Sequence, residues 1–564
     1  MELSENLIIM ERKYKKDNYR TLVSLTTIAF LTILSISTLS CSKGKTKMTD
    51  KNPQTQTTES QVMKTGSSYI IPADFPDLDV IRVDDTYYMV STTMHYMPGC
   101  VILRSYNLVD WEHAAYVYDE LEATPGQTLK DNKGVYGKGM WAASLRYHNG
   151  KFYVSFVAND THKTYLYTAD KIEGPWQKSQ ISGFFHDMSL LFDDDGKIYC
   201  VSGNMNINLT EMKEDLSGPK IGGINKTIIR DNPENVILGY EGSHIYKING
   251  KYYIFFIHMP KGKMRTEACF VSDKIDGPYT GKDVLCSDLG NWNSGVAQGG
   301  IVQANNGNWY GILFQDHGSL GRIPVLVPVK FVDDFPVFDA AGFAPRQVNV
   351  PDNRPDYKYK PLYSNDFTDS AWQWNHIPDK SLVSVQSGVF TVKTDKTAVN
   401  VTKAANTLTQ RTFTENCCGS VTVDASNINE GDITGLCALE GEYGFIGITK
   451  KEGKLKLIVA EHKIPYTPWS MGVQDDEEPV ITTEKEINTA ELKLKANFCL
   501  EHNKENVQFS YFDDNTGNYV DFGAPVKLRY TLDQFVGVRF ALFLYSTEKA
   551  GGSAEFKEFN LELL

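Results

Sequence analysis

A hairpin pattern that recurs five times constrains the fold of this chain more than any other feature of its sequence. Each copy has an apolar run, a polar turn and an aromatic-rich run; the copies read VIRVDDTYYMVST, LRYHNGKFYVSF, LLFDDDGKIYCVSG, HIYKINGKYYIFF and IVQANNGNWYGILF. Four copies carry Asn-Gly or Asp-Gly at the turn, which is the strongest short-range hairpin signal. The remaining turn, at Asp84-Asp85, is a weaker signal of the same kind.

The spacing of these hairpins predicts a propeller. Five tyrosines occupy equivalent places and are separated by 65, 46, 54 and 57 residues: Tyr88, Tyr153, Tyr199, Tyr253 and Tyr310. Hairpin repeats with a period near 50 residues are typical of propeller blades rather than of a solenoid. We therefore expect an all-β fold with a five-bladed β-propeller over residues 66–345.

The remaining length requires a second domain, because 564 residues exceed what one hydrophobic core supports. A proline-containing linker is expected over residues 346–362. Short alternating runs such as GVFTVKT, YGFIGITK and GVRFALFLYS return after it and predict a β-sandwich over residues 363–564. Its long loop IPYTPWSMGVQDDEEP offers Tyr466 and Trp469, which either contact sugar at the funnel mouth or pack on the sandwich.

A ring of polar and aromatic residues is the strongest functional signal. Twelve residues before the equivalent tyrosine stand Trp141, Asp187, Glu241 and Gln298, and Asp77 stands eleven before its own. Residues at one blade position are related by rotation about the propeller axis, so they should lie at one depth of the funnel. Three of the five are carboxylic acids.

Carboxylates crowded into a funnel repel each other and lose hydration, so at least one pKa should rise. One acid can then stay protonated while another is ionised, which is the division of labour that glycoside hydrolysis requires. Trp141 would offer a face for a sugar ring. Each acid by itself could instead serve a turn or hold an axial cation. Their shared offset favours the catalytic interpretation.

The N-terminus predicts export. Residues 21–40 carry no charge and follow a basic region, and Cys41 comes directly after Thr38-Leu39-Ser40, a loose version of the usual box before a cleavage point. This resembles a bacterial lipoprotein signal over residues 1–41, with Cys41 as the lipid attachment site and residues 42–65 as a flexible linker. An uncleaved membrane anchor is the alternative, since about 20 apolar residues can span a bilayer. Both interpretations place the domains outside the cytoplasm and tether them to a membrane.

Composition excludes other classes. A formal net charge of −13 gives no basic stripe for phosphate, so a nucleic-acid partner is not expected. Eight cysteines follow Cys41 without a CxxC metal spacing, and we expect most to be structural thiols.

At these motifs the chain resembles glycoside hydrolase family 43, a family of inverting five-bladed-propeller xylosidases and arabinofuranosidases. The matching stretches are FPDLDVIRVDDTYYMVSTT, HDMSLLFDDDGKIY, GYEGSHIYKINGKYYIFF and GIVQANNGNWYGILFQDHGSLGRIPVLVPV. The stretch GDITGLCALEGEYGFIGITKKEGKLKLIV is similar to the concanavalin-like jelly-roll sandwich of β-xylosidase-like members.

The resemblance implies roles for particular residues. Asp77 would be the general base, Glu241 the general acid, and Asp187 the residue that modulates the pKa of the acid and positions it. Arg322 would contact substrate hydroxyls, and His317 could line the same pocket. An inverting mechanism needs room for a water, so the carboxyls of Asp77 and Glu241 should lie about 6.5–9.5 Å apart.

The resemblance also marks departures from the family pattern. Leu78, Met188 and Ser243 stand where prolines are usual, which removes no carboxylate. Many members hold a central cation with a histidine in a Gly-His-Gly element, and here that element reads Gln298-Gly299-Gly300. No cofactor is therefore expected to be required, a structural calcium is doubtful, and Gln298 joins Trp141 among the expected substrate contacts.

The favoured hypothesis is an exo-acting hydrolase that releases xylose or arabinose from hemicellulose-derived oligosaccharides. A different class, a carbohydrate-binding propeller lipoprotein without turnover, would have been favoured by loss of a ring carboxylate. A retaining fructan- or sucrose-splitting hydrolase ranks low because its Trp-Met-Asn-Asp-Pro-like element is absent from the sequence.

Overall fold

The computed structural model describes residues 61–291, 293–338, 344–464, 476–532 and 534–564. The predicted export signal with Cys41, and the loop residues Tyr466 and Trp469, lie outside the described residues, so those predictions stay open. Within the described ranges no helix has the length and apolar character needed to cross a membrane. Strands dominate these ranges, joined by turns that include the short 3-10 segments η1 (Gly318–Leu320) and η3 (Val401–Lys403).

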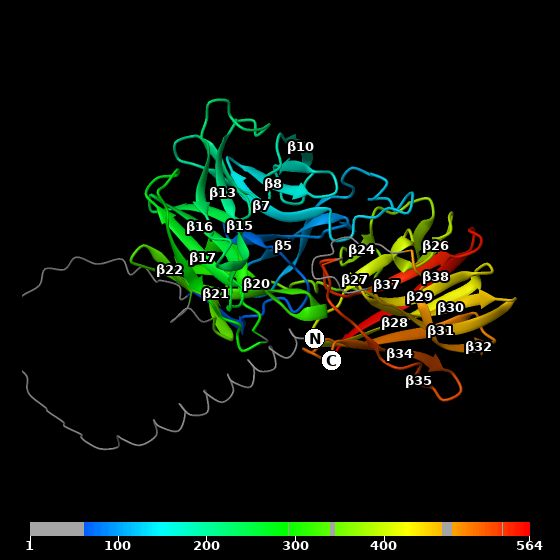
Figure 1. The fold of residues 1–564 in the computed structure, drawn as a ribbon. Helices are drawn as coiled ribbons and strands as arrows, with labels where there is room; N and C mark the ends of the chain where they lie inside the picture. The colour runs from blue at the N-terminus through cyan, green and yellow to red at the C-terminus, as the bar shows by residue number, and fades with distance from the viewer. Residues whose placement is uncertain (1–60, 292, 339–343, 465–475, 533) are drawn as a thin grey trace, which may run out of the picture. The chain divides into compact units, whose positions relative to one another are not determined.

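Five four-stranded antiparallel sheets make up the propeller (Figure 1). The first three blades are β2 (Asp79–Val83), β3 (Thr86–Ser91), β5 (Gly99–Ser105) and β6 (Glu112–Tyr118); β7 (Met140–His148), β8 (Lys151–Ala158), β9 (Lys163–Ala169) and β10 (Gln177–Ile181); and β11 (Ser189–Phe192), β12 (Ile198–Ser202), β13 (Asn206–Met212) and β14 (Asn225–Arg230). The last two are β15 (Val236–Ile248), β16 (Lys251–Pro260), β17 (Thr266–Ser272) and β18 (Thr280–Leu285); and β19 (Ala297–Gln303), β20 (Trp309–Asp316), β21 (Arg322–Val332) and β22 (Phe335–Phe338). The prediction of five blades is confirmed.

The predicted hairpins join the first two strands of each blade. Asn149-Gly150 and Asn249-Gly250 both have positive φ at the two turn residues, as the tight hairpin turn requires. All five equivalent tyrosines fall on the second strand of their blades. The repeat in the sequence is therefore the hairpin of inner strand and second strand, five times over.

The first strand of each blade lines the propeller axis. In order around the ring, β2 lies beside β7, β7 beside β11, β11 beside β15, β15 beside β19, and β19 beside β2. Apolar clusters between neighbouring blades fill the space behind these strands; one of them contains Phe156, Tyr165 and Val154. Because the inner strands form a closed ring, the residues at their first ends face one shared opening.

A β-sandwich of two eight-stranded sheets follows (Figure 1, yellow to red). The first sheet contains β24 (Trp372–Asn375), β27 (Leu408–Arg411), β29 (Asp432–Leu439), β30 (Tyr443–Lys451), β31 (Lys454–His462), β32 (Val480–Ile487) and β37 (Arg539–Ser546), with β4 (Tyr96–Met97) at its edge. The second contains β25 (Val383–Gln386), β26 (Val389–Lys393), β28 (Asn416–Asn427), β33 (Glu491–Cys499), β34 (Asn506–Asp513), β35 (Asn518–Asp521), β36 (Val526–Lys527) and β38 (Ser553–Leu563). Alternating apolar residues from both sheets form its core.

Propeller and sandwich are joined by more than the chain between them, and residues 61–564 form one compact unit. The first-blade segment β4 pairs with β24 of the sandwich, and Nε of Arg411 donates to the backbone oxygen of Asp74 at 2.8 Å. Parts of both predicted linkers form strands instead of irregular segments. β1 (Met63–Ser67) pairs along its length with β23 (Gln347–Pro351), because both segments alternate side chains in a way that suits a two-stranded sheet.

Candidate active site

The five ring positions lie where the inner strands begin. Asp77 and Asp187 each stand two residues before their strand, and Trp141, Glu241 and Gln298 lie in the first half of theirs. The backbone of Asp77, Asp187 and Gln298 has φ of 52°, 47° and 60°. A left-handed backbone is uncommon outside glycine. Its recurrence at three equivalent positions means that one local bend, repeated by blade symmetry, presents these side chains to the opening.

Asp77 is paired with an arginine from the fifth blade. Its Oδ1 lies 2.7 Å from Nη1 of Arg322, the first residue of β21, and both side chains are buried. The guanidinium also faces Oδ1 of Asp316, 3.4 Å from its Nε. The guanidinium favours the anionic form of this carboxyl, which is the state that a general base needs, against the burial that disfavours it.

Glu241 and Asp187 share a histidine that the sequence interpretation had not singled out. Nε2 of His186 lies 3.6 Å from Oδ2 of Asp187 and 3.6 Å from Oε2 of Glu241. The backbone N–H of Gly242 donates to Oδ2 of Asp187 at 3.1 Å, and the Asn204 amide donates to Oε2 of Glu241. The side chain of Glu241 keeps about a fifth of its surface exposed, more than the buried Asp77 and Asp187.

Burial and mutual repulsion shift the proton affinities of this group. Burial raises the pKa of the Asp77 carboxyl above its ordinary value, although the Arg322 guanidinium opposes the rise. Burial, together with the negative charges of Glu241 and Asp77, raises the pKa of Asp187 to about 6 against the opposing charge of His186. Burial by itself would lower the pKa of His186, but the neighbouring carboxylates raise it to about 9. At neutral pH the histidine is therefore a cation between two acids.

Aromatic residues of both domains lie next to the ring residues. The Trp141 ring lies 5.8 Å from the His186 ring and 5.9 Å from the ring of Phe535, a residue of the sandwich. The same Phe535 ring covers the Arg322 guanidinium at 4.4 Å. Gln298 packs against Gly242, because a Cβ added at that glycine would meet the glutamine side chain within 3 Å. The structure thus brings Asp77, Trp141, Asp187, Glu241, Gln298 and Arg322 into one neighbourhood.

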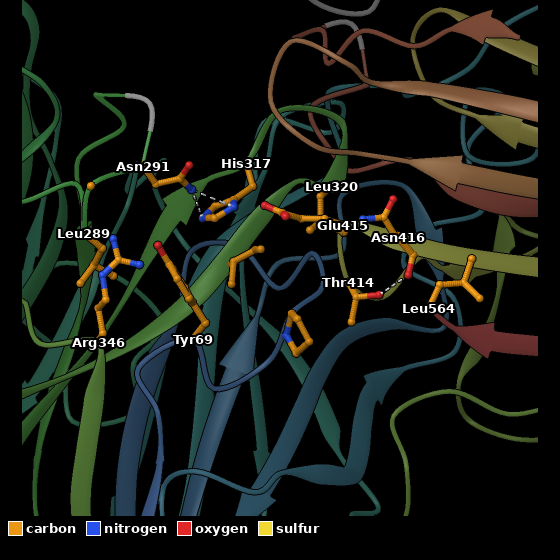
Figure 2. A pocket seen from close by; sticks show the side chains of 13 residues that line it. Tyr69, Leu289, Asn291, His317, Leu320, Arg346, Thr414, Glu415, Asn416 and Leu564 are labelled. Atoms are coloured by element: carbon orange, nitrogen blue, oxygen red, sulfur yellow. Dashed lines mark hydrogen bonds between the residues drawn. The ribbon is translucent and has the colours of Figure 1, made fainter.

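His317 is placed elsewhere, contrary to the expectation that it lines the same pocket. It lines a separate cavity of about 480 Å³ where propeller and sandwich residues meet (Figure 2). Its Nε2 lies 2.9 Å from Oε1 of Gln315, and its ring meets the Tyr69 ring edge-on at 5.2 Å. Burial lowers the pKa of His317 to about 4, so it is a neutral, structurally satisfied histidine. Its nearness in sequence to Arg322 had suggested a shared pocket, but η1 and the turn at Gly321 separate the two.

Among the described residues, one cluster of three or more side chains has the spacing to hold a metal ion: His186, Asp187 and Glu241, whose ligand atoms lie within 4.8 Å of one another. A metal would require the neutral histidine. The two carboxylates raise the pKa of His186 to about 9, so a metal ion would have to displace the proton that the imidazole holds at neutral pH.

Sequence reasoning missed three residues of this site. His186 could have been found, since it directly precedes Asp187, whereas Asn204 lies in the loop between β12 and β13 and carries no motif. Phe535 gave no signal at all, because its place depends on how the sandwich packs against the propeller.

Two family models cover most of the chain. Residues 68–336 match the glycosyl hydrolases family 43, and residues 362–562 match the beta xylosidase C-terminal concanavalin A-like domain.

Individual relatives agree with the family models. A beta-xylosidase of Formosa agariphila is 26% identical, over 93% of this chain and 95% of that protein. A non-reducing end alpha-L-arabinofuranosidase of Bacteroides ovatus is 26% identical, over 61% of this chain and 67% of that protein. Among solved structures, a bifunctional GH43-CE protein of Bacteroides eggerthii has a TM-score of 0.79 at 38% identity. That match covers 89% of this chain and 64% of the other protein, so this chain spans about two thirds of that protein's length.

Proposed function

Since this chain belongs to glycosyl hydrolase family 43, we propose that it is an inverting, exo-acting glycosidase that releases xylose or arabinose from hemicellulose-derived oligosaccharides. One observation supports the proposal above all others. Two sets of acids share the funnel in different charge environments: Asp77 with a guanidinium, and Glu241 with the His186–Asp187 pair.

The proposed chemistry follows from these environments. Asp77 removes a proton from a water that attacks the anomeric carbon, and Glu241 donates a proton to the departing glycosidic oxygen. Asp187 acts as an anion: through the cationic His186 and the Gly242 amide it orients the strand that carries the acid and modulates its proton affinity. Arg322, Trp141 and Gln298 would contact the sugar.

The proposal includes both xylose and arabinose as the released sugar. Relatives of similar identity carry names of both activities, and the two pentoses present similar hydroxyl groups. If the enzyme inverts the anomeric configuration, the carboxyls of Asp77 and Glu241 should lie about 6.5–9.5 Å apart.

The test compares leaving groups. Wild type, Asp77→Asn and Glu241→Gln are assayed on nitrophenyl β-xyloside, nitrophenyl α-arabinofuranoside and xylobiose. Asp77→Asn should lose about 10³-fold in kcat on every cleaved substrate, whereas Glu241→Gln should lose far less on nitrophenyl substrates, whose leaving group needs little protonation. Asp193→Asn is the matched control, because this buried carboxylate of the third blade pairs with Lys247 outside the ring. Equal losses for all three variants would contradict the assignment.

The stereochemical part of the proposal has its own measurement. Proton NMR during the first turnovers should show the anomer opposite to that of the substrate, and the same anomer would refute the inverting mechanism.

We also propose that the protein is exported and tethered to a membrane through a lipid on Cys41, with the sequence as the support. Cys41→Ala should move the protein from the membrane fraction to the soluble exported fraction. An unchanged distribution would favour the uncleaved anchor.

A further inference from the structure

Three polar residues come shortly after the ring carboxylates on the inner strands that surround the propeller axis. Asp79 follows Asp77 by two residues and Ser189 follows Asp187 by two, while His244 follows Glu241 by three. Nδ1 of His244 lies 3.2 Å from Oδ1 of Asp79. Together these residues form a second layer next to the carboxylate ring, on the same three strands.

Arg146 of the second blade connects this layer. Its Nη1 lies 2.6 Å from Oδ2 of Asp79, its Nη2 donates to Oγ of Ser189 at 2.6 Å, and its Nε donates to the backbone oxygen of Leu190 at 2.6 Å. The guanidinium of this second-blade residue thus hydrogen-bonds to both the first and the third blade. We call Asp79, Arg146, Ser189 and His244 the axial network.

The remaining blades join the same network through backbone groups. The N–H of Ile245 in the fourth blade donates to Oγ of Ser189 at 3.0 Å. The hydroxyl of Tyr246 accepts from the N–H of Ile301 in the fifth blade at 2.9 Å, and the Arg146 guanidinium lies 5.7 Å from the centre of that tyrosine ring. All five inner strands are therefore held within one set of contacts.

The axial network depends on the shape of arginine. The planar guanidinium presents several donors in a fixed fork, and three of its donors here point to three different acceptors. Lysine could make one such contact but not three in a plane. Asp79 is wholly buried, and without the guanidinium its charge would keep His244 as its charged partner, with the backbone N–H groups of Leu145 and Val80 as further donors.

The residues of the axis do not fit a calcium ion. Calcium takes six to eight oxygen ligands, with carboxylates foremost. The axial network offers one carboxylate, whose two oxygens already face Arg146 and His244. Gly299 and Gly300 bring no side-chain ligand, and a Cβ at Gly300 would lie 3.0 Å from Oδ1 of Asp79. The Gly299-Gly300 segment of the fifth blade therefore leaves no room for a metal-ligating side chain beside Asp79.

We propose that the Arg146 guanidinium is a built-in axial cation that takes the place of a metal ion and sets the spacing of the strands that carry Asp77, Asp187 and Glu241. Arg146 is thus a positioning residue rather than a catalytic one. This inference rests on the proposed function only for its kinetic readout, because the same network has a readout in stability.

The kinetic experiment uses Arg146→Lys and Arg146→Ala on whichever nitrophenyl pentoside the wild type cleaves. A misplacement of about 1 Å can cost about 100-fold in rate, so kcat should fall by about that factor while KM changes less than about threefold. Millimolar guanidinium or methylguanidinium should restore part of the kcat of Arg146→Ala and leave the wild type unchanged. Arg82→Met is the control, because Arg82 also bridges two blades, to Gln303, but from an exposed position. Folded Arg146 variants with wild-type kcat would overturn the proposal.

The stability experiment needs no activity. Chelation by EDTA and addition of calcium should leave the Tm of the wild type unchanged, and millimolar guanidinium should raise the Tm of Arg146→Ala. A wild-type Tm that falls with EDTA and returns with calcium would refute the built-in cation.

If the Arg146 variants do not fold, Ser189→Ala decides the question: we expect about a tenfold loss of kcat at nearly unchanged Tm, and an unchanged kcat would contradict the positioning role. A wild type that cleaves neither pentoside would refute the proposed function. The Tm measurements would still test the role of Arg146.

Discussion

Replacing His186 by glutamine should move the acid side of the pH–rate profile upward. The imidazolium lies 3.6 Å from Asp187 and 3.6 Å from Glu241, and Asp77 adds a third negative charge to its surroundings. Glutamine keeps a hydrogen-bonding side chain of similar length but carries no charge. The substitution therefore isolates the electrostatic contribution of His186.

The distance gives the size of the effect. Two unit charges 3.6 Å apart interact by about 1 kcal/mol in bulk water and about 4–5 kcal/mol at the effective dielectric typical of protein sites. One pKa unit corresponds to about 1.4 kcal/mol, so losing the imidazolium should raise the pKa of Asp187 by about one to three units. Since that pKa starts at about 6 and the mechanism uses Asp187 as an anion, the acid limb should move to pH 7 or above.

The assay is kcat/KM against pH on a nitrophenyl pentoside, with kcat measured in parallel. His148→Gln is the matched control, because His148 lies at the opposite end of its inner strand and stacks on Phe192. An acid limb that stays within about 0.3 units of the wild type in His186→Gln would refute the argument, because even the bulk-water interaction exceeds that shift.

Three further results are expected. Arg322→Met leaves the buried Asp77 carboxylate without its guanidinium, so urea denaturation should show a loss of about 3–5 kcal/mol in unfolding free energy; a loss below about 1 kcal/mol would contradict the buried ion pair. Phe535→Ala uncovers Arg322 and Trp141, and should raise KM about fivefold with little change in kcat, the cation–π contact being worth about 1 kcal/mol. His186 has a folded-state pKa of about 9 against an ordinary value of 6.5, so its contribution to stability is complete below pH 6.5 and lost as pH rises through 9. The wild type should therefore lose unfolding free energy across that window more steeply than His186→Gln, and parallel curves would disprove the linkage.

The fold followed from the sequence because its signals are local and repeated. An Asn-Gly turn and an aromatic second strand specify a hairpin by themselves, and five copies at one spacing specify a propeller. The ring of Asp77, Asp187 and Glu241 followed as well, since rotation about the axis carries one blade position onto the next.

The parts that could not be predicted depend on contacts between distant segments. Arg146 lies in LRYHNGKFYV, where a strand arginine is ordinarily a solvated charge, and its partners Asp79 and Ser189 are far from it along the chain. Phe535 reaches the funnel only through the packing of one domain on another. His317 shows the converse: four residues separate it from Arg322, yet His317 lines the cavity beside Tyr69 while Arg322 pairs with Asp77.

The two-residue strand β4 has a practical consequence for anyone dividing this protein. Tyr96 and Met97 complete the edge of a sheet whose other strands come from the C-terminal half, and they lie in the connection between β3 and β5 of the first blade. A gene cut near residue 362 would strip that edge and uncover main-chain groups that invite intermolecular pairing. The halves should then precipitate when produced separately, yet recover solubility when co-expressed.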